Sequence, residues 1–238
     1  MRKLIIRILI IGAVFFGLML IAVCIAGVLA VQEPSFYSRL KAQEFPVDAK
    51  DFVRLKRAEF DRWLEDSIES QQQLDSRDVD VDLPVDTYSL QFTEAQLNGI
   101  LASDVKKMGD VSNPRIALSD ELVQIGVEVD VNGTTVIAST SMRPYAGTDG
   151  RLRLEIQSSH IGNLPFPLQT LLSMLQNQMT NISGDLELDL SGSMPVLVLN
   201  TKLGEDKPTI QAVHCQAGQL EITFQPPSVT QDAIVPEG

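Results

Sequence analysis

The chain is poor in the residues that carry most metal and nucleophilic chemistry. Its 238 residues include two cysteines, two histidines and one tryptophan. Only Cys215 lies outside the apolar stretch near the N-terminus, so no intrachain disulfide can stabilise the rest. His160 and His214 are too few for the common zinc sites and lack the H-E-x-x-H spacing. We therefore expect a fold held by packing, without a metal or a cofactor.

Motifs of catalysis and nucleotide binding are also missing. The sequence contains no Gly-x-Ser-x-Gly elbow, no P-loop and no dinucleotide fingerprint. His214 and Cys215 are adjacent, and adjacent side chains in a strand point to opposite faces, so they make a poor catalytic pair. The net charge of −12 disfavours binding along a nucleic-acid backbone. We predict no catalytic residue and no nucleic-acid partner.

One long stretch without charge is present, from Ile8 to Val31. As a helix its 24 residues span about 36 Å, enough to cross a hydrocarbon core of roughly 30 Å. Three basic residues precede it, and the first acid in the chain is Glu33. The positive-inside rule then predicts a cytoplasmic segment (1–7), a single transmembrane helix in the cytoplasmic (inner) membrane (8–31), and the remainder outside.

Two other roles are conceivable for this stretch, a cleaved signal peptide and a lipoprotein signal. Val28-Leu29-Ala30 resembles a signal-peptide cleavage site, but the apolar run is longer than the roughly 7–15 residues of a signal core. Cys24 could mark a lipoprotein, but Val23 stands where a small residue is needed. The length favours a retained anchor that contacts the lipid bilayer.

Residues 32–86 are predicted to form a membrane-proximal helical segment and an acidic linker. Asp48 to about Leu74 carries an apolar stripe at helical spacing. Basic residues gather in this region: Arg39, Lys41, Lys50, Arg54, Lys56, Arg57 and Arg62. They could contact lipid head groups. Acids are interleaved with them, so they could equally be the solvated face of an amphipathic helix.

Residues 87–225 are predicted to form one α+β domain outside the membrane. Thr93 and Gln96 have the spacing of a capping box, which predicts a helix beginning after Thr93. Residues 110–114 are rich in turn formers and should close this helical segment. Polar and apolar residues then alternate from Val123 to Val131, which predicts a half-buried strand.

Turn signals divide the following residues into more strands. Asn132-Gly133 predicts a hairpin to a strand at 136–142, and Asp149-Gly150 leads into Arg151–Ile161. Further strands are expected at 186–190 and 196–199, with a last hairpin around Gly218. Residues 226–238 are predicted to be a disordered tail. The expected fold is one curved antiparallel meander packed with amphipathic helices.

A proline-rich corner separates two of these strands. Gly162 permits unusual backbone angles, while Pro165 and Pro167 fix φ and withhold donors. The corner should aim a helix at the sheet. That helix would carry an apolar stripe of Leu168, Leu171, Leu172, Leu175 and Met179. These five residues are the candidate ligand-binding set, as the lid of an apolar groove. The alternative is that they close on the sheet as a dry core.

The order of motifs resembles a known group. Residues 92–98 (FTEAQLN) open a helix, Pro114–Leu118 (PRIAL) leads into the sheet, and residues 158–167 (SSHIGNLPFP) lead into an amphipathic helix. This series resembles the YpmS-like bacterial membrane-anchored extracytoplasmic proteins, which are uncharacterised in function. Glu33–Tyr37 (EPSFY) is similar to planctomycete-type relatives. The resemblance implies an N-terminal anchor and an α+β domain, and it implies no catalytic residue.

Two functions are compatible with these features. The first is a membrane-tethered, non-catalytic binding module for a lipid or another apolar ligand. The second is a structural or assembly protein of the cell envelope that acts through protein contacts. An apolar pocket of several hundred Å³ would favour the first.

Overall fold

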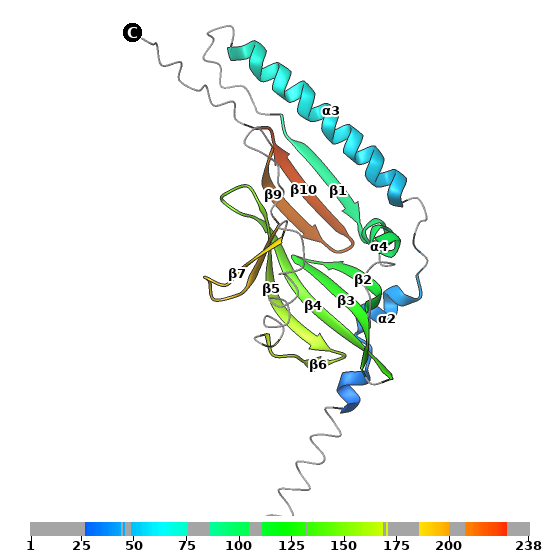
Figure 1. Ribbon diagram of the computed structural model, residues 1–238. Coiled ribbons are helices and arrows are strands. Elements are labelled where there is room, and N and C mark those ends of the chain that lie inside the picture. Colours follow the sequence, from blue (N-terminus) through cyan, green and yellow to red (C-terminus); the bar gives the residue numbers. More distant parts are fainter. Residues whose placement is uncertain are drawn as a thin grey trace, which may run out of the picture.

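The computed structural model describes residues 27–43, 45, 49–75, 86–104, 111–131, 133–168, 170, 186–199 and 208–227. These residues form an α+β fold with two antiparallel sheets (Figure 1). The helices are α2 (Ser35–Lys41), α3 (Ala49–Asp75) and α4 (Glu94–Asp104). The strands are β1 (Tyr88–Thr93), β2 (Val111–Ser119), β3 (Leu122–Val131), β4 (Thr134–Ala146), β5 (Leu152–Ile161), β6 (Leu164–Pro165), β7 (Leu186–Asp189), β8 (Val196–Leu199), β9 (Thr209–Gln216) and β10 (Gln219–Gln225).

The larger sheet contains the predicted meander. Its strands follow the order β2-β3-β4-β5-β8-β7, with β6 paired to the end of β5. The β3–β4 hairpin turns at Gly133 (φ +82°), and β5 begins just after Gly150 (φ +70°). Both turns lie where the sequence placed them, because each needs a residue that tolerates positive φ. The three-stranded antiparallel meander is confirmed.

A second, three-stranded sheet has the order β1-β10-β9. The expected hairpin around Gly218 (φ +83°) joins β9 to β10. The prediction of one sheet was wrong, because β1 was not foreseen and this hairpin pairs with it instead of extending the meander. Helix α3 lies along this smaller sheet (Figure 1). The Phe60 ring contacts the rings of Tyr88 and Phe224.

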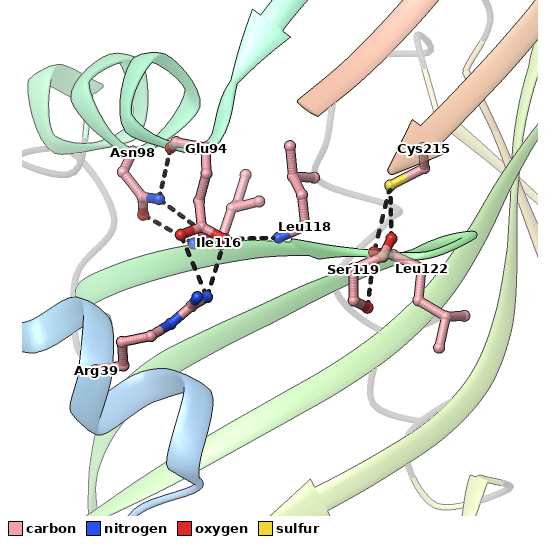
Figure 2. Close-up of polar contacts among 8 residues, drawn as sticks. All are labelled: Arg39, Glu94, Asn98, Ile116, Leu118, Ser119, Leu122 and Cys215. Atoms are coloured by element: carbon pink, nitrogen blue, oxygen red, sulfur yellow. Dashed lines mark hydrogen bonds and ion pairs between the residues drawn. The ribbon is translucent and has the colours of Figure 1, made fainter. Parts of the chain in front are cut away.

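A small core lies where the two sheets meet. Leu118, Val123 and Cys215 are buried together there. The Cys215 thiol donates to the carbonyl oxygens of Ser119 and Leu122 at 3.3 and 3.4 Å (Figure 2). His214 is exposed while Cys215 is buried, so the two side chains do lie on opposite faces of β9. The thiol therefore packs as a core residue.

Helix α4 begins with the predicted capping box. The Gln96 backbone N–H donates to Thr93 Oγ1 at 3.2 Å, and the Thr93 N–H donates to Gln96 Oε1 at 2.8 Å. The expectation for residues 110–114 was wrong, because Val111 already begins β2. The irregular residues form a bulge inside that strand, with Asn113 at φ +47°. A bulge and a turn favour similar residues, so the sequence did not separate them.

Helix α4 also closes the outer edge of the larger sheet. Asn98, which is fully buried, accepts a hydrogen bond from Ile116 N at 2.8 Å and donates to Ile116 O at 2.6 Å. Glu94 accepts from Leu118 N at 2.9 Å and from Arg39 (Figure 2). These side chains occupy edge groups of β2 that would otherwise be free to pair with another strand.

The segment 27–43 is packed against the larger sheet, and we refer to it as the N-terminal strap. Residues 27–31 are helical, and α2 follows after Pro34. Tyr37 and Leu40 have no exposed surface. Gly126 makes room for Tyr37, since a Cβ there would lie 2.8 Å from Tyr37 Cδ2. The strap is thus part of the folded domain.

The expected membrane helix (8–31) falls mostly outside the described residues. Only residues 27–31 of that range are described, and they are helical. None of the helices within the described ranges is both long and apolar enough to cross a membrane. At the other end of the chain, Pro226 and Pro227 are buried beyond β10. The rest of the expected tail lies outside the described residues.

An apolar hollow on the larger sheet

The two faces of β3 differ in what covers them. Gly126 and Glu128 face the strap, where Gly126 meets Tyr37 and Glu128 meets Lys41. The residues at alternate positions point to the opposite face, which is uniformly aliphatic from Ile125 to Val131. Antiparallel pairing places Val127 opposite Ala138 and Val129 opposite Val136, so β4 continues the same apolar face.

This face carries a hollow of about 480 Å³. Its lining comes from β3, β4, β5 and β8, with one residue beyond β6: Ile125, Val127, Val129, Val131, Val136, Ala138, Ser139, Thr140, Met142, Ile156, Ser159, His160, Ile161, Phe166 and Leu197. The volume lies within the roughly 300–1,000 Å³ typical of small-molecule sites. The hollow is therefore large enough for an apolar ligand.

Exposure changes along the length of the hollow. At one end Met142 is 4 % exposed and Ile156 is 1 % exposed. At the other end Val131, the last residue of β3, is 49 % exposed. The hollow is thus closed beside Met142 and Ile156, and exposed at the tip of the β3–β4 hairpin.

The polar groups in the lining are already engaged or sparse. Ser159 Oγ donates to Phe166 O at 2.9 Å, and Phe166 N donates to Ser159 O at 2.8 Å. His160 is half-buried at the edge. Within the described residues, no group of three or more His, Cys, Asp or Glu side chains could hold a metal ion. The surface is suited to binding hydrocarbon, which needs contact area and no specific charge.

The β5–β6 hairpin lies at the rim of the hollow, where Ile161 is one of the lining residues. Gly162 has φ +59°, and its N–H donates to Ile137 O at 2.6 Å. Pairing of His160 with Pro165 and of Ile161 with Leu164 makes Gly162-Asn163 a two-residue hairpin turn. The corner predicted from Gly162, Pro165 and Pro167 is therefore a tight reversal of the chain, in which Pro165 belongs to a strand.

The same turn holds the helical end of the strap. Asn163 N donates to Leu29 O at 2.8 Å, and Asn163 Nδ2 donates to Gln32 Oε1 at 3.1 Å. A side chain at Gly162 would collide with the carbonyl oxygens of Leu29 and Ala30. The last carbonyls of a helix lack partners within it, so the turn supplies one. The absence of a side chain at residue 162 is what permits the approach.

A polar cluster secures the strap on the far face of β3. Glu128 accepts hydrogen bonds from Asn113 Nδ2 at 2.5 Å and Ser112 Oγ at 3.4 Å, and pairs with Lys41 Nζ at 3.4 Å. Burial acts to raise the pKa of Glu128, but hydrogen bonds from Asn113 and Lys41 outweigh it, so the pKa lies below its usual value. Nearby, Tyr37 Oη donates to Asn113 O at 2.6 Å.

A second apolar hollow of about 390 Å³ lies between α3 and the smaller sheet. Phe60, Phe92, Leu97 and Phe224 are among its lining residues. Phe92 and Leu97 flank the start of α4, at the positions of a hydrophobic staple. Because α3 already covers this space, it is a gap between packed elements and a weaker ligand site than the hollow on the larger sheet.

The residues proposed from sequence as a ligand lid are only partly described. Leu168 is helical and half-buried, while Leu171, Leu172, Leu175 and Met179 lie outside the described residues. The strand residues that line the hollow are not among the five ligand-binding residues predicted from the sequence. The sequence does contain a signal for this hollow. The valines of β3 share a face of the sheet with small residues such as Ala138 and Ser159, which leave space unfilled.

The basic residues of the helical segment mostly pair with nearby acids. Lys56 contacts Glu59 at 2.6 Å, and Arg54 contacts Asp51 at 3.2 Å. Figure 1 also shows α3 at the end of the molecule away from residues 27–31. These observations favour the solvated-face interpretation of the α3 charges over contact with head groups.

Comparisons with protein-family models, with curated proteins and with solved structures find no match. The resemblance to YpmS-like proteins stays a prediction, and the candidate site rests on its geometry.

Proposed function

We propose that this chain is a membrane-tethered, non-catalytic module that binds the hydrocarbon part of a lipid in the hollow of the larger sheet. The observation that carries the proposal is the continuous aliphatic lining from β3 and β4 around about 480 Å³. Burial of each methylene group stabilises a complex by about 0.8 kcal/mol, so an acyl chain can bind without polar recognition.

The proposed tether is the sequence-predicted helix of residues 8–31, with the domain outside the cytoplasmic membrane. Two features support it. The stretch has the length and flanking charges of a membrane anchor. Its described end, residues 27–31, is helical and hydrogen-bonded to the rim of the hollow through Asn163.

The alternative, an envelope assembly protein acting through a sheet edge, has less support from the geometry. Asn98 and Glu94 already occupy groups on the β2 edge. The opposite edge strand, β7, has four residues and carries Glu187 and Asp189. Short and charged edges are features that discourage strand pairing.

The proposal can be tested with a substitution that fills the hollow in the full-length chain. Ala138 lines the hollow, so Ala138→Phe should occupy part of the space that an acyl chain would use. Native mass spectrometry of the membrane-extracted protein should show bound lipid in the wild type and at least a tenfold lower occupancy in Ala138→Phe. The matched control is Ala95→Phe, since Ala95 is exposed on α4.

Two results would count against the proposal. The first is a wild-type protein free of lipid in several mild detergents. The second is equal lipid occupancy in Ala138→Phe and Ala95→Phe when circular dichroism shows both to be folded. Crosslinking in membranes that recovers one specific protein, with no lipid bound, would favour the assembly alternative.

A further inference from the structure

We infer that the hollow receives its ligand directly from the outer leaflet of the anchoring membrane, through a mouth at the tip of the β3–β4 hairpin. This inference rests on the proposed function and deepens it, because it names the source and the route of the ligand. The mouth is formed by Val131 and Val136 from the hairpin, by Ile161 at the end of β5 and by Phe166 just after β6.

Exposure indicates which end is the mouth. Ile156 and Met142 are buried at the closed end, while Val131 is 49 % exposed at the other. Strand β4 extends beyond its last pair with β5, which joins Ala138 to Ile161. Val136 therefore has a neighbour on β3 but none on β5, and the sheet narrows there. An aliphatic surface that becomes more exposed toward the hairpin tip is suited to contact the hydrocarbon of a membrane.

The strap places this tip beside the end of the proposed anchor. Asn163 bonds to Leu29, and Gly162 adjoins the carbonyl of Ala30. In Figure 1 the hairpin tip, β6 and helical residues 27–31 all lie at one end of the molecule, whereas α3 lies toward the other. The exposed Val28 and Val31 add apolar surface at the same end as Val131.

The strap also keeps that placement fixed. Beyond residue 32, buried Tyr37 and Leu40 fasten α2 to the sheet, and Lys41 pairs with Glu128. Arg39 pairs with Glu94 at the start of α4 at 3.1 Å. These contacts join the anchor to the domain without a free linker, so the mouth is held at the membrane surface while the smaller sheet is held away from it.

The experiment uses photocrosslinking in the full-length chain, reconstituted in vesicles of phosphatidylethanolamine and phosphatidylglycerol. The photoreactive residue photoleucine, an aliphatic diazirine close in size to leucine, replaces Val131 at the mouth, Val127 inside the hollow, or Gln219 in the distant β9–β10 hairpin. We expect lipid adducts at residues 131 and 127, and at least tenfold fewer at residue 219.

The outcomes separate the inference from the proposed function. Adducts at residue 127 without adducts at residue 131 would support lipid binding in the hollow but would contradict entry of the lipid at the hairpin tip. No adduct at residue 127 would overturn the proposed function, and the inference with it. Equal adduct yields at residues 131 and 219 would mean that the protein contacts lipid non-selectively, and they would also contradict entry at the hairpin tip.

A matched pair of glycine variants tests the role of the strap. Gly162 and Gly218 both have positive φ, so alanine strains the backbone at each. Only the Cβ at residue 162 meets the strap, whereas the one at residue 218 meets nothing within 4 Å. Gly162→Ala should lower the adduct yield at residue 131 at least threefold, and Gly218→Ala should leave it unchanged. Equal yields in the two variants would contradict the inference.

Discussion

Glu128 shows how one residue connects the strap to the sheet. It lies on the face of β3 opposite the hollow, and only 8 % of its surface is exposed. A buried carboxylate is stable when hydrogen-bond donors and a cation surround it, and Asn113, Ser112 and Lys41 supply these. Its ionised form is therefore favoured in the folded state over the unfolded state.

This arrangement predicts a pH-dependent contribution to stability. Because the folded-state pKa of Glu128 is lowered, its stabilising effect is fully present above the usual glutamate pKa and is lost as the pH falls through the lower folded value. Glu128→Gln should therefore reduce the free energy of unfolding near neutral pH by about 1 to 3 kcal/mol. The difference from wild type should shrink as the solution is acidified.

Urea unfolding of the two proteins between neutral and acidic pH measures this difference. The control is Glu121→Gln, because the side chain of Glu121 is 76 % exposed. A difference between wild type and Glu128→Gln that stays constant with pH would show that the ionised carboxylate is not what stabilises the strap.

At the scale of elements, α4 acts as a cover for an edge strand. Asn98 presents one acceptor and one donor to Ile116, much as a neighbouring strand would. The same amide also donates to Glu94 O at 2.8 Å, which orients it within the helix. The position of α4 is therefore set by a buried amide in addition to apolar packing.

Replacement of this amide should be costly. Asn98→Ala leaves the N–H and C=O of Ile116 without their partners, and each unsatisfied buried group costs roughly 1 to 3 kcal/mol. We expect a loss of about 2 to 4 kcal/mol in urea unfolding. Gln91→Ala, at an exposed position in β1, is the control and should change stability by less than about 0.5 kcal/mol. A loss below about 1 kcal/mol for Asn98→Ala would contradict the role of Asn98 in closing the edge.

The elements that sequence predicted correctly are those with local signals. The capping box at Thr93 and Gln96 and the positive-φ turn at Gly133 are specified by neighbouring residues. Strand β1 was missed although its residues alternate between half-buried and exposed, and β2 was missed because it contains a bulge. The contact of Asn163 with Leu29 could not be foreseen, since no local pattern specifies a bond between residues so far apart in the chain.

The candidate site was predicted only in outline. Alternation in β3 predicted an apolar face, but which residues would stay uncovered depends on tertiary packing. The strap covers the face of Gly126 and Glu128 and not the other, because Gly126 alone in β3 lacks a side chain to obstruct Tyr37. The hollow therefore lies on the face of β3 that the strap leaves uncovered. Which face this is depends on the steric fit between segments that are far apart in the chain.

For the whole molecule, the folded unit includes the strap. The sequence suggested a segment and linker (32–86) between the anchor and the domain. Tyr37 and Leu40 are instead fully buried against the larger sheet, and Tyr37 bonds to Asn113. Burial of such side chains typically stabilises by about 1.5 to 3 kcal/mol each, so the strap should resist local opening.

Limited proteolysis of the full-length protein in detergent tests this. Trypsin has sites at Arg39 and Lys41 within the strap and at several residues of α3, all of which are exposed in part. We expect cleavage at Arg39 and Lys41 to be at least tenfold slower in wild type than in Tyr37→Ala, which removes the buried ring. Mass spectrometry of the fragments gives the two rates. Equal cleavage rates in the two proteins would show that Tyr37 does not hold the strap against the larger sheet.

The pairing of β1 with β10 has a consequence for synthesis of the chain. Ser89 and Thr223 lie opposite one another although 134 residues separate them. The ribosome releases β1 early, and its partner emerges when the chain is almost complete. During that interval β1 and the aromatic face of α3 have no sheet to join. Chains that end prematurely, before residue 219, would keep this edge unpaired, and they are the species that chaperones and proteases should recognise.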